Sequence, residues 1–208
     1  MNVTVTTAWV RAIAASMTEH QDYLTQLDSA IGDADHGANM QRGFSAAATA
    51  IDGEEFDQVG QVLVKTGTTL ISSVGGASGP LYGSTFRAAG KMLMVEDADA
   101  AQFHAALSAG VDAVRALGAA EPGDKTIVDA LSPAVLAFGE KADSGGDFAS
   151  AAAAAEEAAE AGAHATIPLQ ARKGRASYLG ARSTGHQDPG ATSTALIFAA
   201  LVSVLNET

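Results

Sequence analysis

Apolar residues along this chain recur at spacings of three and four, which is the period of a helix with one buried face. Trp9, Val10, Ile13 and Met17 follow that spacing. Alternating β-branched residues, which would indicate a half-buried strand, are nearly confined to residues 3–6. Alanine, the strongest helix former, is abundant throughout. The pattern therefore predicts an all-α protein.

The same pattern gives the expected bounds of the helices. Thr6 and Thr7 are suitable caps for a first helix that ends near Leu27. The segment between Thr166 and Pro189 has a mixed pattern, in which only one or two short helical turns are expected. Because no linker-like stretch divides the 208 residues, we expect one domain over residues 1–208, with about eight helices packed as a bundle or ring. The further helices are expected at 38–50, 56–74, 80–95, 98–117, 125–140, 148–163 and 191–205.

Composition narrows the classes of partner. The formal net charge of −12 argues against a nucleic-acid surface, where clustered Lys and Arg supply most of the affinity. The absence of cysteine removes disulfides, thiolate zinc sites and cysteine nucleophiles, and it suits a reducing compartment. The amino terminus lacks a signal-peptide pattern, and the most apolar run, 195–202, is far shorter than the roughly 20 residues of a membrane span. We therefore expect a cytoplasmic protein that binds neither nucleic acid nor membrane.

Three aspartates, Asp28, Asp33 and Asp35, lie close together in the sequence between two expected helices. Two like charges about 4 Å apart repel by roughly 4 kcal/mol at an effective dielectric near 20, so converging carboxylates call for a cation. A Ca²⁺ loop of the EF-hand type needs Gly at its sixth and Glu at its twelfth position. Counted from Asp33, those positions hold Ala38 and Phe44, so Mg²⁺ with phosphate ligands fits better. The alternative is that the three are helix-stop, turn and cap residues.

A glycine-rich segment, 75–84, joins two expected helices and has Pro80 where a first helical residue would stand. Glycines allow close backbone approach, and a helix amino end offers free N–H donors, so this junction suits a phosphate. The chain has neither a Walker A sequence nor a dinucleotide-binding fingerprint. An ordinary tight turn is the alternative here. A further turn, 118–124, precedes a helix with Asp124 as its expected N-cap and is interpreted as structural.

Basic residues concentrate in one segment of this acidic chain. Residues 171–190 hold four of the twelve Lys and Arg, namely Arg172, Lys173, Arg175 and Arg182. Such a concentration suits a polyphosphate or the acidic face of a partner, and the alternative is a solvated loop.

Among the five histidines, His36 and His186 each lie in a Gly-flanked loop beside an aspartate, where either could contact phosphate or transfer a proton. His20, His104 and His164 lie within helical patterns and are taken as ordinary surface or core residues.

Four motifs, in order and spread over nearly the whole chain, make it resemble the L subunit of dihydroxyacetone kinase, the nucleotide-binding subunit. They occupy residues 32–40, 73–81, 121–126 and 185–191. The resemblance implies an antiparallel ring of eight helices with ADP and Mg²⁺ held in the loops at one end. Asp28, Asp33 and Asp35 would then be ligands of one or two Mg²⁺ ions and the chemical core of the site.

The resemblance also implies a set of nucleotide contacts. Some family members carry Met where this chain has Ile127, which keeps the apolar character of the adenine contact but alters its shape. Arg175 is in addition a weaker candidate for stabilising charge during transfer. The nucleotide-binding residues implied are His36, Gly37, Ala38, Asn39, Ala77, Ser78, Gly118, Ile127, Arg175, Asp188, Pro189 and Gly190.

For the reaction, the resemblance implies a subunit in which ADP stays bound as a coenzyme. A phosphohistidine-carrying M subunit would phosphorylate the ADP, and the phosphoryl group would pass to dihydroxyacetone on the K subunit. ATP-dependent members carry this domain fused behind a K domain. The sequence therefore does not decide whether the phosphoryl donor is a phosphohistidine subunit or free ATP. It also leaves open whether the chain forms a homodimer. The rival interpretations are a nucleotide-bound regulatory adaptor, a helical isoprenoid synthase and a metal-dependent phosphohydrolase. The synthase would need a second acidic motif and an aromatic pocket, whereas aromatic residues make up only 5% of the chain.

Overall fold

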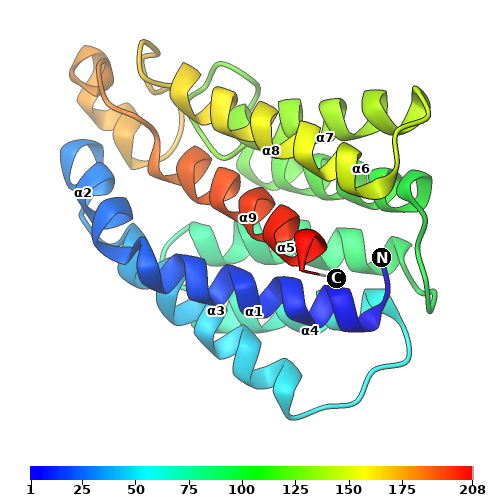
Figure 1. The fold of residues 1–208 in the computed structure, drawn as a ribbon. Coiled ribbons are helices and arrows are strands. Elements are labelled where there is room, and N and C mark those ends of the chain that lie inside the picture. The colour runs from blue at the N-terminus through cyan, green and yellow to red at the C-terminus, as the bar shows by residue number, and fades with distance from the viewer. Residues whose placement is uncertain (208) are drawn as a thin grey trace.

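A computed structural model describes residues 1–207 of the chain, and helices dominate it (Figure 1). Within these residues no strand forms, and the one bridge joins Asn2 to Asp97. The expected all-α class is confirmed. The helices are α1 (Val3–Glu19), α2 (Gln21–Ile31), α3 (His36–Asp52), α4 (Val59–Ser73), α5 (Ser78–Met92), α6 (Ala100–Gly118), α7 (Val128–Asp143), α8 (Phe148–Ala165), the 3-10 helix η1 (Arg175–Ser183) and α9 (Pro189–Asn206).

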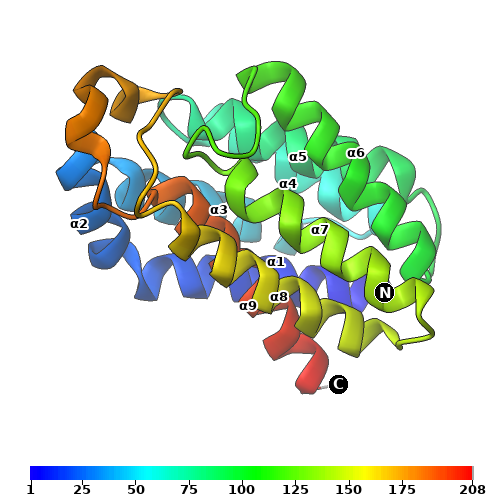
Figure 2. The same ribbon diagram turned by 90° about the horizontal axis from the view of Figure 1, so that it is seen from above.

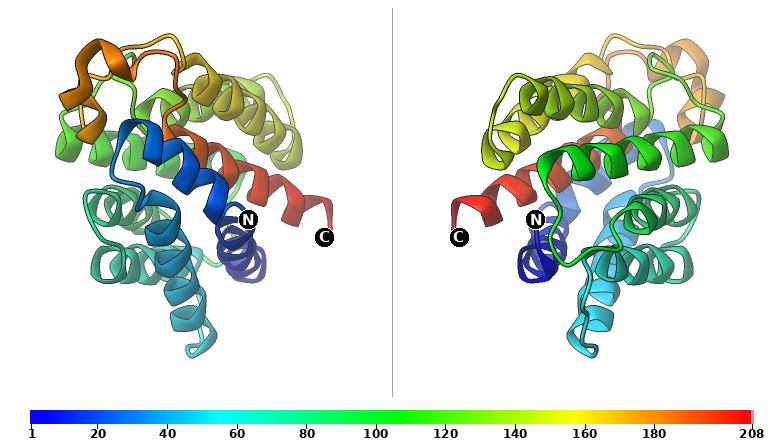
Figure 3. Two further views of the ribbon diagram at one scale, coloured as in Figure 1. Left: turned by 90° about the vertical axis from the view of Figure 1, so that its left-hand side faces the viewer. Right: turned by 90° about the vertical axis from the view of Figure 1, so that its right-hand side faces the viewer.

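Eight of the helices close into a ring, and neighbours along the chain pack side by side from α3 to α9. The ring is completed by α1, which packs on both α3 and α9. Figures 2 and 3 show this arrangement from above and from its two ends. Because successive helices reverse direction, α3, α5, α7 and α9 all begin at the same end. Helix α2 continues from α1 at that end and packs on α3 and η1.

Aromatic side chains line the inside of the ring in one connected series. Trp9 contacts Phe86 and Phe103 with ring centroids 5.8 and 6.0 Å apart, and its Nε1 donates to the carbonyl of Ile197 at 2.9 Å. Phe103 in turn contacts Phe138 at 5.5 Å. These contacts join α1, α5, α6, α7 and α9, so the few aromatic residues are used to hold opposite sides of the ring together.

Glycines bring α4 and α5 unusually close. A Cβ at Gly60 would lie 2.1 Å from the carbonyl oxygen of Gly90, and one at Gly67 would lie 2.5 Å from that of Gly83. Any larger side chain at these positions would force the helices apart. The close packing fixes where α5 begins, and its first turn is part of the site.

The last helix, α9, is the one helix of the described chain that is long and apolar enough to pass a compositional test for a membrane span. More than half of it is buried inside the protein, where it packs against α1, α7 and α8. Its apolar character is accounted for by that central position.

Several expected bounds were wrong. The single first helix, expected from Thr6 or Thr7 to Leu27, is two helices, α1 capped by the side chain of Asn2 and α2 starting after a break at His20. Pro80 is the third rather than the first residue of α5. Asp124 does not cap α7, which begins at Val128, because its carboxylate accepts from the N–H of Glu121 at 2.9 Å.

Candidate functional site

The corner between α2 and α3 brings the three aspartates together. Asp28 is buried in the last turn of α2, and its Oδ2 accepts from the backbone N–H groups of Asp35 (2.9 Å) and His36 (3.2 Å). A Cβ at Gly32 would lie 2.0 Å from Asp28 Oδ1, so the turn requires glycine there. Ala34, with a φ of 62°, supplies the left-handed step that returns the chain to α3. The buried carboxylate thus holds the shape of the loop.

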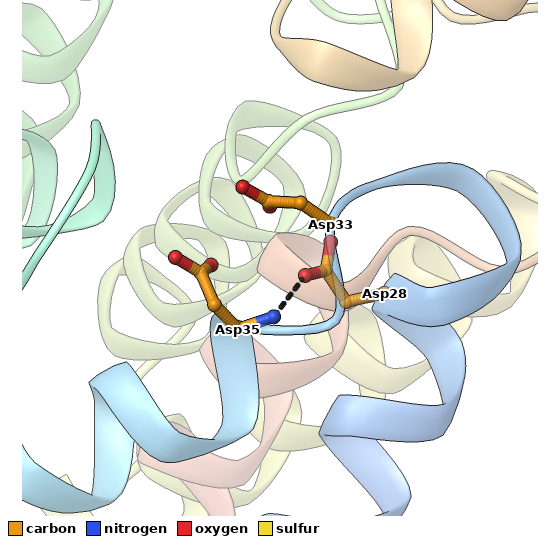
Figure 4. Close-up of side chains that lie close together, drawn as sticks. All are labelled: Asp28, Asp33 and Asp35. Atoms are coloured by element: carbon orange, nitrogen blue, oxygen red, sulfur yellow. Dashed lines mark hydrogen bonds between the residues drawn. The ribbon is translucent and has the colours of Figure 1, made fainter.

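The three carboxylates form an oxygen cluster. One oxygen from each of Asp28, Asp33 and Asp35 can be chosen so that all lie within 4.8 Å of one another (Figure 4). Asp35 stands at the N-cap position of α3, but its side chain makes no capping bond there and remains with the cluster. Arg175 reaches Asp33 at 2.9 Å and offsets part of the charge. A hard cation that keeps water or phosphate oxygens in its remaining positions fits this all-carboxylate set, with one ligand buried and two exposed.

Beside the cluster, His36 is held by two hydroxyl groups. Its Nε2 lies 2.9 Å from Ser193 Oγ, and its Nδ1 lies 3.3 Å from Ser78 Oγ. Burial lowers the pKa of His36, although the charges of Asp28 and Asp35 oppose that shift. Ser193 continues the chain of hydrogen bonds to the hydroxyl of Tyr82 at 2.7 Å. The ring therefore joins α3 to α5 and α9. The sequence suggested phosphate contact or proton transfer for His36, and the structure adds a third role, which is to hold the hydroxyl of Ser78 in place.

The amino ends of helices differ between the two ends of the ring. At the far end α1, α6 and α8 are capped by the side chains of Asn2, Asp99 and Asp147. At the aspartate end neither α3 nor α5 nor α7 has a side-chain cap bond from its N-cap residue, and Asp188 alone caps its helix, α9. The first N–H of α3 donates to Asp28 and that of α7 to Thr126 Oγ1, so α5 is the helix whose amino end presents N–H donors and positive dipole that an anion can satisfy.

The α4–α5 loop leaves open space in front of its uncapped helix end. Gly76 has a φ of 64°, and a Cβ there would meet nothing within 4 Å. A Cβ at Gly75 would lie 3.1 Å from Asn39 Oδ1, which accepts from Arg42 at 2.6 Å. The amide N–H groups of Asn39 are thus the part of that side chain that remains for a ligand.

A cavity of about 460 Å³ lies among these loops. Its wall changes in character along the ring, from the carboxylates and Asn39 at α3, past the glycine-rich loop, to an apolar surface on α5, α6 and the start of α7. The apolar part is formed by Leu81, Val114, Leu117, Ala120 and Ile127. Such a cavity suits a ligand with one anionic and one apolar end.

Most residues singled out from the sequence lie on this wall. Gly37 and Ala38 do not: Gly37 packs against α2, where a Cβ would lie 2.1 Å from the carbonyl oxygen of Gln21. His186 is exposed and also lies off the wall, as do Arg172 and Arg182, whereas Lys173 lines it. The candidate residues on the wall are Asp28, Asp33, Asp35, His36, Asn39, Ala77, Ser78, Gly118, Ile127, Arg175, Asp188, Pro189 and Gly190.

Two buried titratable groups lie in this region: Lys125, which sequence reasoning did not single out, and Asp188, which it included only through the family resemblance. Lys125 is 1% exposed, and burial lowers its pKa against the opposing charges of Asp188 and Asp129. Burial also raises the pKa of Asp188 to about 7, and its carboxylate accepts from the N–H of Ala191 at 2.7 Å. A lysine in an apparently structural turn carries no local signal of burial, because the groups that surround it come from residues 41 to 61 positions away.

Comparison with known proteins agrees with this geometry. The DAK2 domain matches residues 30–203. The chain is 43% identical to the ADP-binding subunit of the PEP-dependent dihydroxyacetone kinase of Escherichia coli, over 96% of this chain and 95% of that protein. It is 39% identical to the ADP-binding subunit of the PTS-dependent dihydroxyacetone kinase of Lactococcus lactis, over 99% of both.

Solved structures show the same fold. The dihydroxyacetone kinase of C. freundii in complex with AMP-PNP and Mg²⁺ superposes with a TM-score of 0.77 and 25% identity. The match covers 98% of this chain and 34% of that longer one. The family match over residues 30–203 and the near full-length identities place this chain in the DAK2 domain family, beside the ADP-binding subunits of dihydroxyacetone kinases.

Proposed function

We propose that this chain is the ADP- and Mg²⁺-binding subunit of a dihydroxyacetone kinase that acts in the cytoplasm. It would relay a phosphoryl group from a phosphohistidine-carrying M subunit, through ADP held in the cavity, to dihydroxyacetone on a K subunit. The observation that carries the proposal is the single cavity in which a carboxylate cluster, an uncapped helix end and an apolar wall adjoin. The names of the full-length relatives, which are ADP-binding subunits, support it.

Each part of the wall has a role in this reaction. Asp28, Asp33 and Asp35 would hold Mg²⁺, which neutralises phosphate charge when bound. The first turn of α5 and the hydroxyl of Ser78 would bind phosphate oxygens through N–H and O–H groups. The apolar surface around Ile127 would bury the adenine ring. No side chain needs to act as a nucleophile, because phosphoryl transfer depends mainly on positioning and charge stabilisation.

A retained coenzyme is tested by denaturing the purified protein in the presence of Mg²⁺ and chromatographing the supernatant. We expect adenine nucleotide close to one equivalent per chain. A supernatant free of adenine nucleotide would contradict the coenzyme role.

Catalysis is tested by reconstitution with K and M subunits of a dihydroxyacetone kinase, with dihydroxyacetone phosphate measured as product. Phosphorylated M subunit should support turnover, whereas free ATP with the K subunit alone should not. Turnover with ATP would instead assign the chain to the ATP-dependent type. Bound nucleotide without turnover under either condition would leave the regulatory adaptor as the function.

A further inference from the structure

Lys125 makes an unusual set of hydrogen bonds for a lysine. Its side chain is 1% exposed, and its ammonium group donates only to backbone carbonyls. Lys125 also has a φ of 65°, a left-handed conformation that a side chain of this size rarely adopts. The four acceptors are the carbonyl oxygens of Thr166 (3.0 Å), Leu169 (3.1 Å), Ser183 (2.7 Å) and His186 (2.5 Å).

The four acceptors belong to the two ends of one loop. Thr166 and Leu169 precede the basic segment, and Ser183 and His186 follow it. We call residues 170–182 the basic loop, and we call the flanking stretches 166–169 and 183–186 its neck. Two further bonds close the base of the loop. Gly185 N–H donates across the neck to the carbonyl of Ile167 at 2.8 Å, and Ala171 N–H, at the start of the basic loop, donates to Ser183 Oγ at 2.9 Å. The whole has the form of an Ω-loop, closed at its base and exposed at its tip.

The tip of the basic loop has little of its own to hold it. Its apolar contacts to the rest of the protein form a small cluster of Ile31, Ala171 and Ala176, with Leu179 packed against it. Arg175 and Tyr178 are exposed, the latter by 89%. Two polar bonds also hold the loop, from Arg172 N–H to the carbonyl of Asp124 at 3.0 Å and from Arg175 to Asp33. At the neck, the buried ammonium is the one charged group bonded to both flanking stretches among the described residues.

We propose that Lys125 is a positioning residue whose ammonium closes the neck of the basic loop and thereby places Arg175 beside the aspartate cluster. Removing the ammonium takes this donor from all four carbonyls. The carbonyl of Thr166 keeps a bond from Leu169 N–H at 3.1 Å, whereas the buried carbonyl of Ser183 loses its partner, and such a loss is costly. The neck would then open locally while the ring of helices, whose core does not include Lys125, stays folded. The effect on nucleotide affinity rests on the proposed function, whereas the effect on the loop does not.

Limited trypsin digestion without nucleotide tests the effect on the loop. The basic loop contains the trypsin sites Arg172, Lys173, Arg175 and Arg182, so opening of the neck should expose them first. We expect Lys125→Met to raise the rate of cleavage there by about tenfold or more. A tenfold rise corresponds to a loss of about 1.4 kcal/mol from the free energy that keeps the loop closed. Lys91→Met, at an exposed lysine near the end of α5, should leave that rate at the wild-type value.

Cleavage elsewhere separates local opening from general unfolding. In Lys125→Met the sites in the helices, such as Arg11 and Lys65, should be cut at the wild-type rate. An unchanged rate in the basic loop, or an equal rise at all sites, overturns the proposal. If Lys125→Met does not fold, Lys125→Arg decides by the same criterion, because it keeps the charge but cannot reproduce the geometry of a compact ammonium.

A double-mutant cycle tests whether Lys125 acts through Arg175. With Mg²⁺ present, Lys125→Met and Arg175→Ala should each weaken ADP binding by about tenfold, in the range typical of supporting residues. The double variant should be little weaker than either single one, since a misplaced Arg175 has no further effect when removed. Fully additive losses overturn this route of action. A wild type that binds no ADP contradicts the proposed function alone and leaves the digestion result to judge Lys125.

Discussion

The two sides of the cavity are built in different ways. The acidic side, residues 28–39, is one continuous stretch whose loop is shaped by the bond of Asp28 to two N–H groups seven and eight residues away. The opposite side combines residues 118–127 with 166–190, and Lys125 ties them through bonds that span 41 to 61 positions. Local sequence is enough to specify the first side, whereas the second exists only once the ring has formed.

The two sides also differ in how their charges are satisfied. Asp33 and Asp35 lie exposed near like charges, with Arg175 as the one counter-charge within ion-pair distance among the described residues. Lys125 and Asp188 are buried and hydrogen-bonded within the protein itself. We therefore propose that an added cation completes the acidic side, whereas the charges of the opposite side are satisfied within the protein. Substitutions on the two sides should accordingly affect different properties.

The largest effect is expected on the acidic side. Asp33→Ala should weaken Mg²⁺-dependent ADP binding by about 100-fold or more, because the loss of a proposed direct ligand should exceed the roughly 10–100-fold cost of changing outer supporting groups. Helicity should be unchanged, since the side chain of Asp33 contacts Arg175 and takes no part in the core. Calorimetric titration with ADP at fixed Mg²⁺, together with circular dichroism, measures both.

The matched control for Asp33→Ala is Asp57→Ala, which removes the same charge from an exposed position in the α3–α4 connection at the far end of the ring. It should leave the ADP affinity unchanged. Equal losses in the two variants would mean that net charge, rather than a metal ligand, governs binding. An unchanged affinity in Asp33→Ala would remove the metal assignment.

On the opposite side, the buried Asp188 should make stability depend on pH. Its pKa is raised from 3.8 to about 7, so the folded state holds the proton more tightly than the unfolded state does. Stability from this group is therefore greatest at low pH and falls as the pH rises from about 4 through 7. Relative to Asp188→Asn, which keeps an acceptor for Ala191 N–H, the wild type should lose about 2 kcal/mol of unfolding free energy between pH 5 and 8.

Asp147 offers a control with the opposite sign. It caps α8 at the far end, is exposed, and has a pKa lowered by its hydrogen bonds to Ser150. Its contribution is present above the unfolded pKa and is lost only at lower pH, so Asp147→Asn should run parallel to the wild type between pH 5 and 8. Urea unfolding at each pH measures these differences. Parallel curves for the wild type and Asp188→Asn would contradict a buried carboxyl that titrates near neutrality.

The difference between the acidic side and the opposite side of the cavity also explains how much of the site the sequence could predict. Helical spacing and alanine content predicted the all-α class, and the seven helices expected after residue 37, such as the one at 148–163, needed only small changes in bounds. Asp28, Asp33 and Asp35 could be grouped because a loop of a few residues leaves their carboxylates little freedom to separate. The break at His20 was missed, since no glycine or proline marks it.

The role of Lys125 could not have been predicted in the same way. Nothing in its neighbours distinguishes a lysine that will be buried from one that will be solvated, and the turn was interpreted as structural with Asp124 as a cap. Burial is decided by the packing of the 166–188 segment, and the bonds that result are too distant in sequence to be inferred from spacing. The family resemblance supplied the residues of the opposite side, but not the reason for their placement.

The smallest effect is expected where the two sides meet, at the ion pair between Arg175 and Asp33. With side chains 68% and 36% exposed, it should contribute less than about 1 kcal/mol, so Arg175→Ala without ligand should lower the unfolding free energy by no more than that. The loss should shrink further at high salt, as it should for Arg11→Ala, which removes the similarly exposed pair with Asp52.

Since Arg175 competes with a cation for Asp33, Arg175→Ala should also bind Mg²⁺ alone slightly more tightly, by about twofold. Denaturant unfolding at two salt concentrations and Mg²⁺ titration measure these changes. A loss above about 2 kcal/mol would mean that the acidic side depends on the opposite one for its fold, contrary to its local construction.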